Sequence, residues 1–163
     1  MVALKVEEQK AFTEGLFIGE IFDKFLVREA EIVTWNRFSI DGKIRQGYFS
    51  EEELEENRIE EYSSWKSLKP ICYSPIRGKR LPESFRIVFL MPPSARDRFV
   101  SGRVPGISPD QVGGLYINVQ YENQEMICVT GTSMKQFTMD RTLENEWDEN
   151  VRKFLRKNGV AVS

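Results

Sequence analysis

Five basic residues in two separate stretches of the chain have the clearest capacity for chemistry. They are Lys43, Arg45, Arg77, Lys79 and Arg80. Tyr48, Phe49 and Tyr73 lie close to them in sequence. Cationic side chains bind phosphate oxygens and aromatic rings stack on nucleobases, so a fold that joined the two stretches would create a surface for phosphate or nucleic acid. Solvated loops are the simpler interpretation of the same residues.

Two other groups of residues invite a catalytic interpretation. The segment Thr130–Lys135, TGTSMK, has the glycine, hydroxyl and lysine groups of a phosphate-binding loop, but it lacks the GxxxxGK[ST] order and the strand-to-helix context. A bent strand is the favoured interpretation, and Ser133 with Lys135 would form a nucleophile pair only with tertiary support. Asp41 and Asp140 are the most tempting carboxylate pair, although a turn and a helix cap explain them more simply.

The chain has no histidine, and its two cysteines, Cys72 and Cys128, are far apart in sequence. These facts remove Ser-His-Asp and Cys-His nucleophiles, histidine acid–base chemistry and the ordinary zinc sites. Cysteine is among the residue types most often buried, so two buried, reduced thiols are predicted. The sequence therefore predicts no catalytic residue, no cofactor and no metal ligand.

The strands that would position these residues are clearest in the second half of the chain. Apolar and polar residues alternate in Leu115–Tyr121 and again in Met126–Thr130, which predicts a hairpin with a short polar loop. Gly131 marks a bend, and Met134–Met139 predicts a third extended run. The three strands would form a meander.

The order of elements repeats along the chain, which predicts an internal duplication. Residues 1–46 would hold a strand at 3–6, a helix at 7–18 and strands within 22–40, with a polar break at 28–31 and a hairpin turn at Asp41–Gly42. Residues 83–140 would hold a strand at 85–91, a helix at 94–101, a loop at 102–114 and the meander. FSID at 38–41 would correspond to FTMD at 137–140. Each half would be βαβββ.

Two helical segments complete the predicted architecture. An insert at residues 47–82 contains a capping box, Ser50 with Glu53, that opens an acidic stretch with seven glutamates between Glu51 and Glu61. Residues 141–158 predict an amphipathic helix with acids at its start and bases at its end. The predicted fold class is α+β in a single domain. A largely antiparallel sheet would be covered by helices on one face, and its other face or its edges would be free for partners.

Two resemblances extend this interpretation. The order of elements resembles one domain of the sliding-clamp fold, which implies a clamp-like architecture, although the first helix is acidic where clamp helices that face DNA are basic. The segments FSIDGKI, YSSWKSLKP and GLYINVQYENQEMICVTGTSMKQFTMDRTLENEWDENVRKFL resemble a family of uncharacterised small proteins from clostridial bacteria, a domain of unknown function. That resemblance covers most of the chain and implies no activity, cofactor or site residue.

Composition narrows the class of function. The formal charge is −2, so the chain has no global attraction to nucleic acid or anionic lipid. It has no apolar run of about 18 residues and no signal peptide, which predicts a cytoplasmic protein without a membrane partner.

The leading hypothesis is a non-catalytic binding or adaptor module for a protein partner or a second copy, which would use a sheet edge, the acidic insert or the 102–114 loop. The alternatives are a nucleic-acid-associated clamp-like protein and a small-molecule-binding protein or carboxylate-dependent enzyme.

Overall fold

A six-stranded antiparallel sheet forms the centre of the molecule in a computed structural model that describes all 163 residues. The strands are β1 (Ala3–Lys5), β2 (Leu26–Val33), β3 (Arg37–Asp41), β4 (Ser84–Leu90), β5 (Val112–Glu122) and β6 (Glu125–Met134). Their spatial order is β1-β6-β5-β4-β2-β3, and every neighbouring pair is antiparallel. The predicted α+β class is confirmed.

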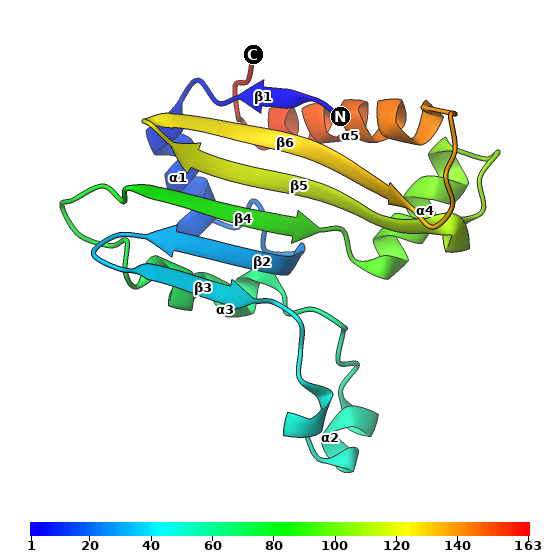
Figure 1. Cartoon of the computed structure of the whole chain (residues 1–163), viewed down its shortest axis with the longest axis horizontal. Helices are drawn as coiled ribbons and strands as arrows, with labels where there is room; N and C mark the ends of the chain where they lie inside the picture. The colour runs from blue at the N-terminus through cyan, green and yellow to red at the C-terminus, as the bar shows by residue number, and fades with distance from the viewer.

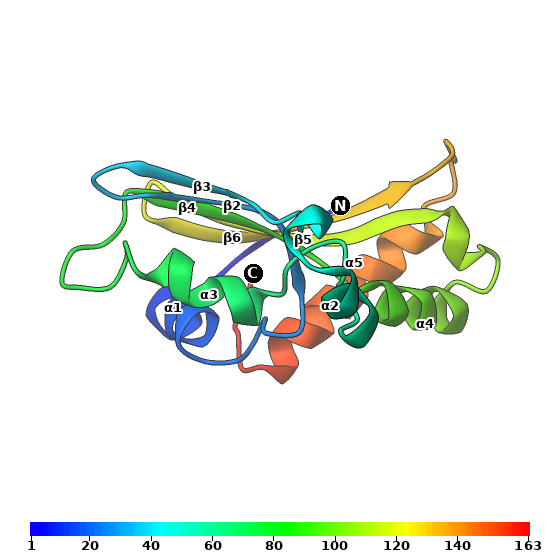
Figure 2. The same ribbon diagram turned by 90° about the horizontal axis from the view of Figure 1, so that it is seen from below.

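Four of the five helices cover one face of this sheet (Figure 2). They are α1 (Gln9–Phe17), α3 (Trp65–Tyr73), α4 (Pro93–Arg103) and α5 (Thr142–Lys157). The short helix α2 (Glu51–Glu56) projects beyond the β3 edge (Figure 1). The opposite face of the sheet carries no helix, as the sequence predicted. None of the helices combines the length and the apolar character that crossing a bilayer requires.

The core lies between the sheet and the four helices. In β5, the inward-facing Leu115, Ile117 and Val119 are fully buried, because strand alternation sends every second side chain to the helix-covered face. Trp147 of α5 is also buried there. Aromatic rings fill much of the remaining space, and the ring of Phe22 stacks on Phe89 with centroids 4.4 Å apart.

The insert and the last helix form as their sequences predict. The Glu53 N–H donates to Ser50 Oγ and the Ser50 N–H donates to Glu53 Oε1, both at 3.1 Å, so the predicted capping box is confirmed. The apolar face of α5, which includes Leu143, Trp147 and Val151, is buried against the sheet side.

The predicted strand boundaries are wrong in two places. Strand β2 runs through the supposed polar break at 28–31, and the hairpin turn to β3 lies at residues 34–36 instead of Asp41–Gly42. Strand β6 passes through Gly131 and ends at Met134, so residues 135–141 form no third strand. FSID at 38–41 therefore lies in a strand, whereas FTMD at 137–140 lies in an exposed loop.

The two halves share an order of elements but not an arrangement. Each half is βαββ, because the third strand of each predicted βαβββ unit is absent. In the second half β4, β5 and β6 are successive neighbours, whereas β1 of the first half lies at the far edge beside β6 and not beside β2. The internal duplication stays a prediction that only the order of elements supports.

Candidate functional site

A groove of about 720 Å³ opens on the helix-covered side of the molecule, between α4, α5 and the segment Glu20–Phe25. We call it the helix-side groove. Its apolar lining consists of Ile21, Phe25, Met91, Ala95, Ile117, Trp147, Val151 and Phe154. Pockets that bind small molecules commonly have volumes of about 300–1,000 Å³ and a mostly apolar lining with a few polar groups. The groove lies within that range of volume, and eight of the eighteen residues that line it are apolar.

The sheet and α5 supply the floor and one wall. Residues 147, 151 and 154 follow helical spacing, so their side chains share the face of α5 that packs toward the sheet. Phe99 of α4 contacts Trp147 edge-on, with ring centroids 5.6 Å apart, and this contact joins the two helices beside the groove. Ile117 reaches the groove from the inward face of β5.

The second wall is the segment Glu20–Phe25, which has no regular secondary structure but is held at several points. Lys69 Nζ donates to Gly19 O and to Asp23 Oδ1, each at 2.7 Å. The Lys69 and Asp23 side chains are only 13% and 15% exposed. Phe25 packs edge-on against Phe154 of α5, with centroids 5.3 Å apart. The wall is therefore fixed to both α3 and α5.

Four cations line the groove without a carboxylate partner. Lys24, Lys66, Arg98 and Lys157 are exposed and take part in no ion pair. Two acids, Glu20 and Asp23, also line the groove, and Asp23 is neutralised by Lys69. The unpaired charge at the groove is therefore predominantly positive, and it favours an anionic ligand.

The start of α4 adds hydrogen-bond donors to the same groove. No side chain caps this helix, and the Arg96 N–H is the first to bond within it, to Pro92 O at 2.9 Å. The N–H groups of Ser94 and Ala95 therefore have no partner within the helix. Both residues line the groove, and Arg98 lies one turn further along α4.

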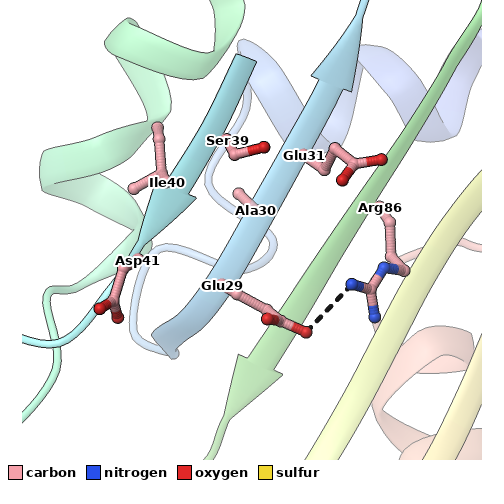
Figure 3. Close-up of a pocket in the computed structure, with 7 residues that line it drawn as sticks. All are labelled: Glu29, Ala30, Glu31, Ser39, Ile40, Asp41 and Arg86. Atoms are coloured by element: carbon pink, nitrogen blue, oxygen red, sulfur yellow. Dashed lines mark ion pairs between the residues drawn. The ribbon is translucent and has the colours of Figure 1, made fainter. Parts of the chain in front are cut away.

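The open face of the sheet has a smaller hollow of about 360 Å³ between β2, β3 and β4 (Figure 3). Its charged residues are paired. Arg86 binds Glu29 at 3.1 Å, Arg37 binds Glu31 at 2.5 Å and Arg45 binds Asp41 at 3.3 Å. Because these exposed ion pairs neutralise one another's charge, the hollow resembles an ordinary solvated sheet face.

The five basic residues singled out from the sequence do not converge. Arg77, Lys79 and Arg80 line a hollow of about 390 Å³ together with Trp35, at the turn between β2 and β3. Lys43 and Arg45 follow the other end of β3, where Lys43 pairs with Tyr62 in an isolated bridge. A single surface of all five, with Tyr48, Phe49 and Tyr73, is therefore not formed. Nucleic-acid binding by any of them stays a prediction.

The other sequence candidates have structural roles. Both cysteines are buried free thiols, and burial raises the pKa of Cys72 and Cys128 to about 12. Hydrogen bonds from the Thr142 hydroxyl and N–H lower the pKa of the Asp140 carboxyl, which stabilises the turn leading into α5, although no side chain caps that helix. Thr130–Lys135 lies largely within β6.

No three side chains among His, Cys, Asp and Glu are grouped as a metal-ligand set. The carboxylates with a shifted pKa are Asp140 and Glu144, and in both the shift is downward. Neither residue lines the helix-side groove. The groove therefore offers binding groups, namely cations, amide N–H donors and apolar surface.

Sequence reasoning missed the helix-side groove because its members come from five parts of the chain. The only local signal was the amphipathic pattern of residues 141–158, which predicted the burial of Trp147 and its neighbours but gave no reason for a gap beside them. Lys24, Lys66 and Arg98 stand in separate segments whose proximity depends on long-range packing.

Comparison with known protein families finds a match over most of the chain. The family model described as Family of unknown function (DUF5721) matches residues 15–163. No curated protein and no solved structure matches the chain.

Proposed function

We propose that this chain, which belongs to the family of unknown function DUF5721, binds a small amphipathic anion in the helix-side groove. The observation that carries the proposal is the combination of an apolar lining with four cations that have no carboxylate partner. A ligand with an apolar body and a carboxylate, sulfonate or phosphate group would bury its body in the groove and present its charge to those cations. This is a binding function, and it requires no reaction.

The aromatic end of the groove would hold the ligand's body. Phe25 and Phe154 are half-buried and line the groove, so a ligand that covered them would remove more of their apolar surface from water. Their rings already contact one another across the two walls. An acyl chain or an aromatic ring fits this surface.

The anionic group would lie toward the start of α4. Arg98 supplies a guanidinium, and the N–H groups of Ser94 and Ala95 point away from the helix body at its positive end. Lys24, Lys66 and Lys157 would raise the local concentration of anions around the opening.

Calorimetric titration with dodecanoate tests the proposal directly. We expect saturable binding to the wild-type protein, and we expect R98E/K157E to weaken it by about tenfold or more, equivalent to at least about 1.4 kcal/mol. Ala95→Trp would fill the groove without removing a charge, and it should block binding while leaving the cations in place.

The matched control is R103E/K153E, which reverses one exposed charge on α4 and one on α5 outside the groove. It should bind dodecanoate nearly as well as the wild type, apart from the effect of net charge. Equal losses of affinity in the two double variants would show that the net charge of the protein, and not the groove, determines binding. No saturable binding of dodecanoate or of anilinonaphthalene sulfonate would remove the proposed function.

A protein-binding role is the second candidate, and the difference between the two sheet edges favours it. The C-terminal residues cover β1, since Lys5 N–H donates to Ser163 O at 3.0 Å and Ser163 N–H donates to Lys5 O at 2.9 Å. Strand β3 pairs only with β2, so its outer edge is free to accept a strand from a partner. Hydrogen exchange would test it. Amides of Arg37–Asp41 that stay equally exchangeable with and without a co-purified partner would exclude strand addition there.

A further inference from the structure

A tryptophan with most of its surface in solvent stands at the turn between β2 and β3. Trp35 is 73% exposed, whereas Trp65 and Trp147 are 0% and 1% exposed. Its ring packs against that of Phe38 in a T-shaped arrangement, with centroids 5.3 Å apart. An indole in this position keeps a large apolar face available for stacking.

Three cations share a hollow with this ring. Arg77, Lys79 and Arg80 line the same hollow of about 390 Å³, and all three are exposed. None of them takes part in an ion pair. One carboxylate, that of Glu83, also lines the hollow. The hollow therefore has a local charge of about +2 in a chain whose formal charge is −2.

The loop that carries these cations is attached to the turn that carries Trp35. The Glu83 N–H donates to Val33 O at 2.9 Å, which fixes the end of the loop to the end of β2. Ile76 is buried, and the Arg77 N–H donates to Tyr73 O at 3.0 Å, which fixes the start of the loop to α3. The closeness of ring and cations is therefore a consequence of backbone pairing and core packing.

We propose that this hollow binds a phosphorylated nucleoside unit. The base would stack on the Trp35 indole, and the phosphate oxygens would accept hydrogen bonds from Arg77, Lys79 and Arg80. An aromatic face beside unpaired cations matches the two parts of such a unit, a flat base and a phosphate a few bonds away. The hollow shares no residue with the helix-side groove, so this proposal is independent of the proposed function.

Tryptophan fluorescence reports on this site, because Trp35 is the one tryptophan with most of its surface in solvent, and loss of the quenching in Trp35→Phe assigns the signal to it. We expect a fluorescein-labelled oligouridylate of about eight nucleotides to raise its anisotropy on binding, and the unlabelled strand to quench Trp35 emission. If three cations neutralise phosphates, the logarithm of the binding constant should fall with the logarithm of salt concentration with a slope of about −2.

Variants separate stacking from charge. We expect Trp35→Ala to weaken anisotropy-detected binding by about tenfold with the salt slope unchanged, and Trp35→Phe to retain most of the affinity. R77A/K79A/R80A should weaken binding by more than tenfold and flatten the salt dependence. The matched control is K43A/R45A, which removes two exposed basic residues at the other end of β3 and should leave the affinity and the quenching unchanged.

Uridine monophosphate distinguishes a free nucleotide from a nucleic acid. Quenching by the mononucleotide at the same affinity as by the oligonucleotide would assign a free nucleotide as the ligand, and much tighter binding of the oligonucleotide would assign a single strand. Both outcomes support the site. No quenching by either ligand in low salt, or an equal loss of affinity in K43A/R45A and in the triple variant, would overturn it. Circular dichroism should show all these surface variants folded.

Discussion

The indole Nε1 of Trp147 donates a hydrogen bond of 2.9 Å to the backbone carbonyl oxygen of Tyr116. This bond joins the middle of α5 to β5 at the residue before Ile117, which forms part of the groove floor. On the opposite face of the sheet, the Tyr116 ring lies 5.6 Å from the guanidinium carbon of Arg28. The hydrogen bond therefore attaches the groove wall that α5 forms to the middle of the sheet.

Replacing Trp147 should destabilise the protein and enlarge the groove. We expect Trp147→Ala to lower the free energy of unfolding by about 3–5 kcal/mol, because the side chain is buried and its removal leaves a cavity. Trp147→Phe keeps most of the apolar contact but removes the N–H donor, so a smaller loss of about 1–2 kcal/mol is expected from the missing bond and the smaller ring. Urea unfolding measures both losses. Equal losses for Ala and Phe would contradict the packing contribution.

Gly42 should not tolerate a side chain, although the hairpin turn that the sequence predicted at Asp41–Gly42 does not form there. A Cβ atom at this position would lie 1.7 Å from the carbonyl oxygen of Val27. The Gly42 backbone is held there, since its N–H donates to Arg28 O and its carbonyl accepts from Ser63 N–H, both at 2.9 Å. We expect Gly42→Ala to cost about 1–3 kcal/mol.

The control for that substitution is Gly47→Ala, because no atom lies within 4 Å of a Cβ there. Its effect on the free energy of unfolding should be within about 0.5 kcal/mol, as is usual for exposed sites. Thermal unfolding of both variants makes the comparison. A neutral Gly42→Ala would show that β2 and residue 42 do not approach as closely as described.

The sequence predicted the elements that are buried along a single face or a single stripe. Strand β5 is buried on one face and α5 along one stripe, so their periods of two and about 3.6 residues are visible in the residues themselves. The Ser50 capping box is also local, because each of its hydrogen bonds spans three residues. Local chemistry was sufficient for these features.

The strand errors have different physical causes. In β2 a register shift between Val27 and Glu29 leaves two successive residues, Arg28 and Glu29, exposed, which interrupts the alternation without ending the strand. At the end of β6 the cause is the partner strand. Met134 pairs with Val112, where β5 begins, and after it the Lys135 N–H makes a single further bond, to Gln111 O at 2.9 Å, which is too little to continue the strand. Neither a bulge nor the length of a partner strand can be read from local periodicity.

The candidate sites depended even more on long-range structure. The sequence suggested one surface of five basic residues, and nothing in it placed Trp35 beside Arg77, Lys79 and Arg80 or Lys43 away from them. The helix-side groove depends on where α4 packs between β4 and β5 and on the packing of Glu20–Phe25, neither of which has a sequence period. Local reasoning therefore found clusters of neighbours and missed sites built from distant segments.

Lys69 should be important for the groove wall although it does not line the groove. Its ammonium binds Gly19 O and Asp23 Oδ1 in a partly buried position, so Lys69→Met would leave Asp23 without a counter-charge. We expect a loss of about 1–3 kcal/mol in the free energy of unfolding. Urea unfolding measures it, and binding of dodecanoate should weaken as the wall loosens.

Two comparisons isolate this interaction. Lys66→Met changes an exposed, unpaired lysine on the same helix and should have little effect on stability. A double-mutant cycle with Asp23→Asn should give a coupling energy of about 0.5 kcal/mol or more, because the two side chains are in direct contact. Additive effects of Lys69→Met and Asp23→Asn would show that the pair does not hold the wall.

The two thiols should be unreactive in the folded protein and should make it less stable in alkali. Burial raises the pKa of Cys72 and of Cys128 from 9.0 to about 12, so little thiolate exists in the folded state at pH 8. Reaction with a disulfide reagent should therefore be slow until urea unfolds the chain.

Because the folded pKa values of the two thiols lie above the unfolded ones, the unfolded state loses these protons first. The free energy of unfolding should then fall as pH rises from about 9 toward 12, by up to about 1.4 kcal/mol per pH unit for each thiol. Lysines and tyrosines titrate in the same range, so the comparison is with C72A/C128A, whose pH dependence should be shallower. Equal slopes for the two proteins, or rapid modification of the native protein at pH 8, would contradict the burial of the thiols.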